Sequence, residues 1–368
     1  MADLGGSVRR LAILVAIVAL SSAQSATPLG AQEQNRCDNV RDTGTSNVTG
    51  REHLNVWDVN LKFFQRVQEG LHPDCFFDEL ARIAKLDDGT KPDLILGQEI
   101  GDDSYRRFVQ LVENALGTEY SFRHTVVAGG KGGNIVVWRR ARLRLQQPKS
   151  DVLRWKRFAP VNRECKVIPN WQIGVRLHDV EQDKDLVAAS VHFGARDEIC
   201  MHENILRSHS QLENKWGSPP LLVLGGDFNE RPDNKEDAES TGSWRREENP
   251  DCWYALFSET HPDSKNGKTC KGTSLTGYFD VVREKNTGAE ICPQWSHGQV
   301  KLPANPDSCD SQKARIDFIW VRYSEGGEIV TDVPDIGLAA SDRGYSRDGD
   351  WAGSKYSDHR AVRARLTW

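Results

Sequence analysis

The sequence lacks three features that would each assign the chain to a large class of proteins. Its longest apolar run, Leu11–Leu20, is ten residues, whereas a transmembrane helix needs about 20. It has no Cys-x-x-Cys pair, because the closest cysteines are Cys292 and Cys309, and this argues against a structural zinc site. It also lacks an excess of positive charge, since 48 Lys and Arg face 53 Asp and Glu. Bulk electrostatics would therefore not hold nucleic acid.

The segment before residue 27 has the pattern of an export signal. Arg9 and Arg10 supply positive charge, the apolar run Leu11–Leu20 follows, and small and polar residues come next, in the order that secretory signals use. We therefore expect removal of residues 1–26, with cleavage between positions 23 and 31, a flexible leader at 27–45, and a secreted, extracellular protein. The arginine pair leaves the Sec and twin-arginine routes both open, and a short membrane anchor is the alternative.

All eight cysteines lie after this segment, and an even number in an exported chain predicts disulfide bonds. The cysteines are Cys37, Cys75, Cys165, Cys200, Cys252, Cys270, Cys292 and Cys309. Cys165 and Cys200 flank two strands that we expect to be neighbours, Trp171–Leu177 and Leu186–Val191. Antiparallel neighbours would bring these outer ends within disulfide reach, so we predict that Cys165 pairs with Cys200.

Short apolar runs separated by turn residues predict a domain with many strands and few helices over residues 46–368. Residues 231–312 form an insert rich in Asp, Asn, Gly, Pro and Ser, with four of the cysteines. The predicted strands are Leu54–Val59, Leu94–Leu96, Asn134–Trp138, Trp171–Leu177, Leu186–Val191, Leu221–Leu224, Ile316–Val321 and Ala361–Leu366. Apolar residues at helical spacing predict helices at Cys75–Leu86 and His202–Trp216, and a helix at Cys252–Phe257 fits the insert.

Several of these strands end on, or contain, polar groups that a buried strand does not need. The set comprises Glu99, His192, Asp227 with Asn229, Asp317, and the Asp358-His359 pair before the last strand. Any one of them could be an ordinary turn or cap residue. Their number along one chain instead indicates a catalytic site.

These residue types suit the hydrolysis of a phosphate ester. Carboxylate oxygens such as those of Glu99 are hard ligands that Mg²⁺ prefers, and the cation neutralises charge on the phosphoryl oxygens. A buried carboxylate beside an imidazole fixes its tautomer and stabilises its charged form, which is the relationship we expect between Asp317 and His359. Asp227 and Asn229 would then orient the attacking water.

Four segments in this order resemble the endonuclease/exonuclease/phosphatase superfamily, which includes deoxyribonuclease I. They are PDLILGQE at 92–99, GGDFNERPD at 225–233, ARIDFIW at 314–320 and YSDHRAV at 356–362. The resemblance implies an α/β fold, a four-layer sandwich of two packed mixed β-sheets flanked by helices. Gly97 departs from the family pattern, which has an apolar residue before Gln98, and this could loosen that strand.

The resemblance also implies a role for each motif residue. The family's first strand ends in Asn; Asn55 and Asn60 compete for this position, and we choose Asn60 because Val56–Val59 before it reads as a strand. The implied metal ligands are Asn60, Glu99 and Asp358, with Mg²⁺ as the cation and Mn²⁺ or Ca²⁺ as alternatives. The implied catalytic residues are Asp227, which positions water, and Asn229, which touches the phosphate. His192 would polarise the phosphate or help the leaving group, and His359, oriented by Asp317, would be the general base or stabilise the phosphate.

The substrate that we expect is nucleic acid, cleaved by a secreted metal-dependent phosphodiesterase of the deoxyribonuclease I type. The motifs GDFNERP and VHFGA most resemble those of deoxyribonuclease I and of the cytolethal distending toxin nuclease subunit. The alternatives are a sphingomyelinase-like phospholipid phosphodiesterase, a phosphatase, or an inactive binding protein on this fold. We expect no stable membrane insertion and no obligate protein partner. The loop at 340–357 is expected to touch substrate through Arg343, Arg347 and Lys355.

Overall fold

The computed structural model describes residues 53–61, 76–77, 80–81, 91–101, 104–125, 133–161, 164–194, 200–229, 275, 277–281, 317–324, 326–329 and 362–368. The predicted signal and leader, nearly all of the insert with its helix at 252–257, and the loop at 340–357 lie outside these residues. So do Asp358, His359, Arg343, Arg347, Lys355 and six cysteines, namely Cys37, Cys75, Cys252, Cys270, Cys292 and Cys309.

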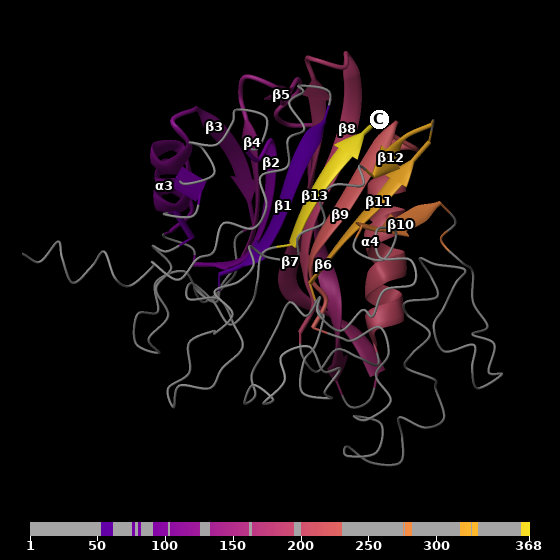
Figure 1. The fold of residues 1–368 in the computed structure, drawn as a ribbon. Coiled ribbons are helices and arrows are strands. Elements are labelled where there is room, and N and C mark those ends of the chain that lie inside the picture. Colours follow the sequence, from indigo (N-terminus) through magenta and orange to yellow (C-terminus); the bar gives the residue numbers. More distant parts are fainter. Residues whose placement is uncertain are drawn as a thin grey trace, which may run out of the picture.

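Two mixed sheets form the centre of the molecule (Figure 1). The first has the order β12 (Glu328–Ile329), β13 (Val362–Thr367), β1 (Leu54–Asn60), β2 (Leu94–Ile100), β4 (Gly133–Arg139) and β3 (Tyr120–His124). The second has the order β10 (Tyr278–Asp280), β11 (Asp317–Tyr323), β9 (Leu221–Asp227), β8 (Lys184–His192), β7 (Glu164–Asp179) and β5 (Leu143–Arg144), and β6 (Val152–Val161) pairs with β7. Within them, β1–β2 and β8–β9 run parallel.

The central strands β1, β2, β4 and β9 are buried on both faces, which explains their nearly continuous apolar sequences. In β1, Leu54 and Val56 join the core between the two sheets, whereas Trp57 and Val59 join the cluster under helix α3 (Tyr105–Leu116). A third cluster packs the second sheet against helix α4 (Met201–Trp216). The order of layers is therefore helix, sheet, sheet, helix, and the predicted four-layer α/β sandwich is confirmed.

All eight predicted strands are present. The largest difference in length is at β7, which begins seven residues before the predicted Trp171. Helix α4 confirms the prediction at His202–Trp216, and the described part of Cys75–Leu86, residues 76–77 and 80–81, is helical. The sequence analysis missed β3, β5, β6, β10, β12 and α3. Within the described residues, no helix is both long and apolar enough to cross a membrane.

The register of the strands brings their carboxyl ends together at one end of the sandwich. Asn60 at the end of β1 pairs with Gln98 of β2 in the first sheet. His192 at the end of β8 pairs with Asp227 of β9, and Asp227 pairs with Asp317 of β11 in the second sheet. Parallel strands that end at one edge gather their terminal side chains there. The polar residues singled out in the sequence therefore share one end of the fold.

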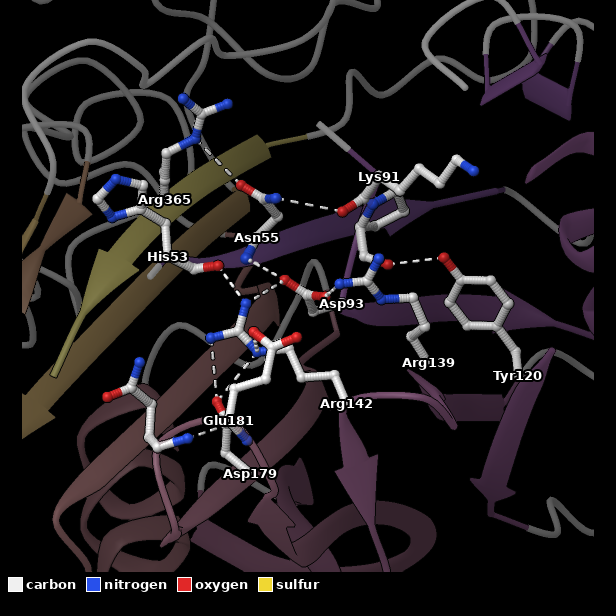
Figure 2. Close-up of polar contacts among 12 residues, drawn as sticks. His53, Asn55, Lys91, Asp93, Tyr120, Arg139, Arg142, Asp179, Glu181 and Arg365 are labelled. Carbon is white, nitrogen blue, oxygen red and sulfur yellow. Dashed lines mark hydrogen bonds and ion pairs between the residues drawn. The ribbon is translucent and has the colours of Figure 1, made fainter. Parts of the chain in front are cut away.

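A buried ionic cluster joins the two sheets at the opposite end (Figure 2). Arg142, which is 1% exposed, contacts Asp93 at the start of β2 at 3.0 Å and Asp179 at the end of β7 at 3.1 Å. It also donates to the carbonyl of His53, and Arg139 forms a second ion pair with Asp93. Burial raises the pKa of the Asp93 carboxyl, and the two guanidinium groups oppose that rise.

Strands β6 and β7 form a ribbon that continues past the ends of β8 and β9, beside α4 (Figure 1). A disulfide bond between Cys165 of β7 and Cys200 before α4 fastens it, as predicted from the sequence. Asn204 of α4 also accepts from the backbone N–H of Phe158 at 2.7 Å and donates to its carbonyl at 3.0 Å. The ribbon is therefore held both covalently and by paired hydrogen bonds at the end of the fold where the polar residues meet.

Candidate active site

Three side chains from both sheets converge where the strands end. Glu99 of β2, His192 of β8 and Asp227 of β9 each present one ligand atom, and these atoms lie within 4.8 Å of one another. His192 Nε2 is 3.6 Å from Glu99 Oε1 and 3.6 Å from Asp227 Oδ2. Asp227 is buried, while Glu99 and His192 keep a small exposed area. Two of the three side chains are therefore partly exposed, whereas the third lies beneath the surface.

Asn60 links the two carboxylates of this cluster. Its side-chain Nδ2 donates to Glu99 Oε1 at 3.1 Å and to Asp227 Oδ2 at 2.8 Å. Asn55, the other candidate from the sequence, lies at the opposite end of β1, where it contacts Lys91, Asp93 and Arg365 (Figure 2). The structure thus brings Asn60 to the site and places Asn55 in the ionic cluster.

A bulge in β2 turns Glu99 toward the cluster. The pairing of β2 with β4 shifts between Gly97 and Ile100, so that two residues of β2 oppose one of β4, and Glu99 has a φ of 53°. A side chain at Gly97 would lie 2.6 Å from Ile135 of β4. Gly97, which we expected to loosen the strand, is thus needed for close packing against β4. A residue such as Glu99, which has a positive φ beside a β-bulge, is typical of a functional position.

The two glycines before Asp227 allow the strands to come close enough to place its carboxylate. A Cβ on Gly226, whose φ is 153°, would overlap the carbonyl oxygen of Val191 on β8, and one on Gly225 would lie 2.6 Å from Leu96 in the other sheet. Beyond Asp227, the ring of Phe228 packs edge-on against Phe193 and Phe318. The close packing of the two glycines and of the Phe228 ring therefore fixes the position of the Asp227 carboxylate.

Asn229 holds Asp227 in one orientation. Its backbone N–H donates to Asp227 Oδ1 at 2.7 Å, and its side-chain Nδ2 donates to Asp227 Oδ2 at 3.0 Å and to the carbonyl of Phe193 at 2.7 Å. Its φ is 54°, so that two of the three described non-glycine residues with positive φ lie at this site. The resemblance implied that Asn229 touches phosphate, but here both of its amide hydrogens contact protein oxygens.

Gln172 and Asn134 position His192, and the sequence analysis missed both. Gln172 Oε1 accepts from the backbone N–H of His192 at 2.7 Å, and its Nε2 donates to the carbonyl of His192 at 3.1 Å. Asn134 of β4 in turn donates to Gln172 Oε1 at 2.8 Å. Both side chains are buried. Each is a polar residue next to apolar residues of a predicted strand, and this is the signal that could have found it.

A second buried polar group lies below the site. Gln98 Nε2 donates to Asp58 Oδ1 at 2.7 Å and to Ser190 Oγ at 3.1 Å, and Ser190 Oγ donates to the carbonyl of Gly97 at 3.0 Å. These bonds join β1 and β2 of one sheet to β8 of the other, directly beneath Glu99 and His192. Buried hydrogen bonds of this kind fix the relative position of packed elements.

Asp317 is fully buried at the start of β11, opposite Asp227 in the register. Its predicted partner His359, the predicted ligand Asp358, and the predicted substrate contacts Arg343, Arg347 and Lys355 lie outside the described residues. The relationship between Asp317 and His359 therefore stays a prediction.

The sequence matches the model of the Endonuclease/Exonuclease/phosphatase family over residues 69–359. The chain belongs to this family. Members of this family are hydrolases that act on phosphoester bonds and are generally dependent on divalent metals. No curated protein matches the sequence.

Solved structures share the family fold at low sequence identity. A functionally unknown conserved protein from Enterococcus faecalis V583 is 12% identical with a TM-score of 0.51, and the match covers 85% of this chain and 99% of that one. A family protein from Leptotrichia buccalis C-1013-b is 14% identical with a TM-score of 0.50 and coverages of 86% and 100%. The human Nocturnin catalytic domain, solved with a bound sulfate anion, is 15% identical with a TM-score of 0.49 and coverages of 86% and 93%. These likenesses concern the fold alone.

The residues present fit a divalent cation of the kind that the family uses. Two carboxylates, Glu99 and Asp227, converge on one amide group, and a bound cation would relieve their mutual repulsion. Carboxylate oxygens are hard ligands suited to Mg²⁺, and a single imidazole, His192, completes the group. The sequence analysis assigned Glu99 to the metal, and His192 and Asp227 to catalysis. The structure places all three in one cluster.

Proposed function

We propose that the chain is an exported, Mg²⁺-dependent phosphodiesterase that hydrolyses nucleic acid. The observation that carries the proposal is the convergence of Glu99, His192 and Asp227 from two sheets, in a family of phosphoester hydrolases. Strained backbone clusters at active sites and ligand-binding sites, so the positive φ of Glu99 and Asn229 supports a working site over an inactive binding protein.

The residues of the site divide the work of hydrolysis. Glu99 and Asn60 would hold the cation, which when bound supplies positive charge to the phosphoryl oxygens. Asp227, held by hydrogen bonds from Asn60 and Asn229, would orient the attacking water and accept its proton. His192 Nε2, 3.6 Å from both carboxylates, would donate a hydrogen bond to a phosphoryl oxygen of the substrate. As the water oxygen bonds to phosphorus, the bond to the leaving oxygen would break, and the leaving oxygen would take up a proton from solvent.

Export is supported by two independent features. The segment Arg9–Ala26 has the composition of a secretory signal, and the Cys165–Cys200 disulfide is the kind of bond that persists in oxidising compartments. Nucleic acid as substrate is supported by the sequence motifs GDFNERP at 226–232 and VHFGA at 191–195. A secreted enzyme with these motifs would degrade extracellular nucleic acid.

A phospholipid phosphodiesterase is the second candidate, favoured by one observation. Val161 and Val167, on the β6–β7 ribbon, are 39% and 47% exposed, and an apolar ribbon tip can dock on a membrane surface. Lys166 and Glu164 at the same tip are charged and exposed, which weakens this reading. If Val161→Ser/Val167→Ser slows hydrolysis of sphingomyelin vesicles, but not of a soluble diester, the lipid candidate replaces nucleic acid.

One panel tests the proposed function. Purified mature protein is assayed against plasmid DNA, RNA, sphingomyelin vesicles and bis-p-nitrophenyl phosphate, with Mg²⁺ and with EDTA. We expect cleavage of nucleic acid and of the small diester with Mg²⁺ only. Full activity in EDTA would refute the metal assignment. Hydrolysis of sphingomyelin, with DNA and RNA left intact, would refute the choice of substrate and keep the mechanism.

A further inference from the structure

Three cations on the flank of the sandwich have no carboxylate partner in the part of the chain that the structure describes. Arg123 of β3 and Arg154 and Lys156 of β6 form no ion pair with any residue in the described ranges, although the chain as a whole is acidic. By contrast, Arg140, Arg176 and Lys166 on nearby surfaces each pair with an acidic residue. An unneutralised cluster in an acidic protein indicates an anionic ligand.

The register places this cluster beside the reactive centre. Lys156 pairs with Trp171 of β7, and Ile173, two residues further on, pairs with Ser190 of β8. Continuing the register puts Trp171 opposite His192. The Lys156 backbone therefore lies two strands from His192, roughly 10 Å at the usual strand spacing. Arg154 follows on the same face of β6, one pleat further from the end of the sandwich.

Contacts with neighbouring groups hold the three side chains in place. Lys156 Nζ lies over the Trp171 ring at 5.0 Å, and Arg154 Nε donates to the carbonyl of His124 on β3 at 2.9 Å. Arg123 Nη1 donates to the carbonyl of Phe122 at 2.8 Å. On the other side of β6, Arg207 of α4 donates to the carbonyl of Lys156 at 2.9 Å. These contacts orient the side chains and leave their net charge in place.

The two arginines repel each other across the gap between the sheets. Burial lowers the pKa of the Arg154 guanidinium, and the positive charge of Arg123 lowers it further. A pair of like charges held close together costs free energy that a bound anion would recover. Guanidinium groups present planar, paired donors that match phosphate oxygens, and a Lys ammonium acts as a point charge.

We propose that Arg123, Arg154 and Lys156 form a subsite that binds the phosphates flanking the scissile bond of a nucleic-acid strand. This inference rests on the proposed function, because it extends the same site along a polymeric substrate. The strand would leave the Glu99–His192–Asp227 cluster across β7 and follow the cations along β6 toward β3. A substrate with one phosphate would not reach them.

The test compares a polymer with a small diester. The triple variant Arg123→Gln/Arg154→Gln/Lys156→Gln is assayed on a 12-residue oligonucleotide, DNA or RNA as the wild type prefers, and on bis-p-nitrophenyl phosphate. The control variant Arg140→Gln/Lys149→Gln/Lys184→Gln removes the same charge elsewhere on the surface. We expect the subsite variant to raise KM for the oligonucleotide by about 10- to 100-fold, from a loss of a few phosphate contacts. Both variants should hydrolyse the small diester within about twofold of wild type.

The dependence on salt gives a second readout. Loss of three phosphate contacts should reduce the slope of log KM against log salt by about 2, at roughly 0.7 per phosphate of a single strand, and the control should keep the wild-type slope. The conservative variant Arg154→Lys/Lys156→Arg should recover much of the affinity. Circular dichroism of all variants checks that the fold is retained.

The remaining outcomes separate the subsite from the proposed function. Unchanged oligonucleotide kinetics in the subsite variant would overturn the subsite alone. An equal loss on the oligonucleotide and on the small diester would also overturn it, because the cations would then serve the reactive centre or the fold. A wild-type enzyme that hydrolyses the small diester, but neither binds nor cleaves oligonucleotides, would overturn the nucleic-acid assignment and the subsite with it.

Discussion

Replacing Arg142 by Met should destabilise the protein strongly while leaving the reactive centre intact. The Arg142 side chain is buried between two buried carboxylates, Asp93 and Asp179, and also donates to the carbonyl of His53. Methionine fills similar volume but leaves both carboxylates with fewer donors. Breaking a buried ion pair from one side costs about 3–5 kcal/mol, which lowers Tm by roughly 10 °C in a domain of this size.

Arg140→Met is the matched control, because Arg140 is two residues away and its pair with Glu119 is largely exposed. An exposed pair contributes about 0–1 kcal/mol. Thermal and urea unfolding, followed by circular dichroism, give the two free energies of unfolding. The reasoning fails if Arg142→Met costs no more than Arg140→Met. Activity below the unfolding transition should be retained, because the cluster lies at the opposite end of the strands from Glu99.

The loss of stability caused by Arg142→Met should also depend on pH. Burial raises the pKa of Asp93 in the folded state, and Arg142 is the largest interaction opposing that rise, so the variant should raise this pKa further. A carboxyl with a raised folded pKa stabilises the protein below its unfolded pKa, about 3.9, and this stability is lost as pH rises through the folded pKa. The difference in free energy of unfolding between wild type and Arg142→Met should therefore become smaller as pH falls toward about 4.

Four further predictions concern the site and the ribbon. Glu99→Ala should abolish most activity, with partial recovery at high Mg²⁺ in steady-state assays; full activity would exclude Glu99 as a cation ligand. His192→Ala should lower kcat by about 10²–10⁴-fold with a smaller change in KM, and an effect on KM alone would show that it only binds substrate. Gln172→Leu should lower kcat by about tenfold or more, because the backbone of His192 loses both bonds and small displacements are costly; kcat unchanged in a folded variant would remove Gln172 from the positioning network. Cys165→Ser/Cys200→Ser should cost up to about 4 kcal/mol in urea unfolding, as expected for opening a 35-residue loop, and unchanged stability would mean that the hydrogen bonds to α4 hold the ribbon without the disulfide.

The sequence predicted the strands whose residues are apolar on both faces. Runs such as Leu221–Leu224 are buried on both sides, so their composition alone identifies them. Strand β6 was missed because it pairs only with β7 and carries cations at Arg154, Lys156 and Arg157, which interrupt the apolar pattern. Helix α3 was missed although Tyr105, Phe108, Val109, Val112 and Leu116 have helical spacing and are buried.

The site was predictable to the extent that each side chain ends a strand. Glu99, His192 and Asp227 were identified because polar residues follow apolar runs, and the structure brings them together. Gln172 and Asn134 could not be assigned, because their function depends on register between strands far apart in the chain. The orientation of Asn229 toward Asp227 depends on a positive φ, which no residue pattern in this segment announces.

Because the site is divided between two sheets, the distances between its side chains depend on how the sheets are aligned. Glu99 belongs to one sheet, and His192 and Asp227 to the other, so a slip of one sheet past the other would separate the ligands before any strand unfolds. Substitutions in the shared core should therefore weaken cation affinity at temperatures where the secondary structure is still intact. Conversely, a cation bound to side chains of both sheets would hold the sheets together, and Tm should rise with the cation concentration.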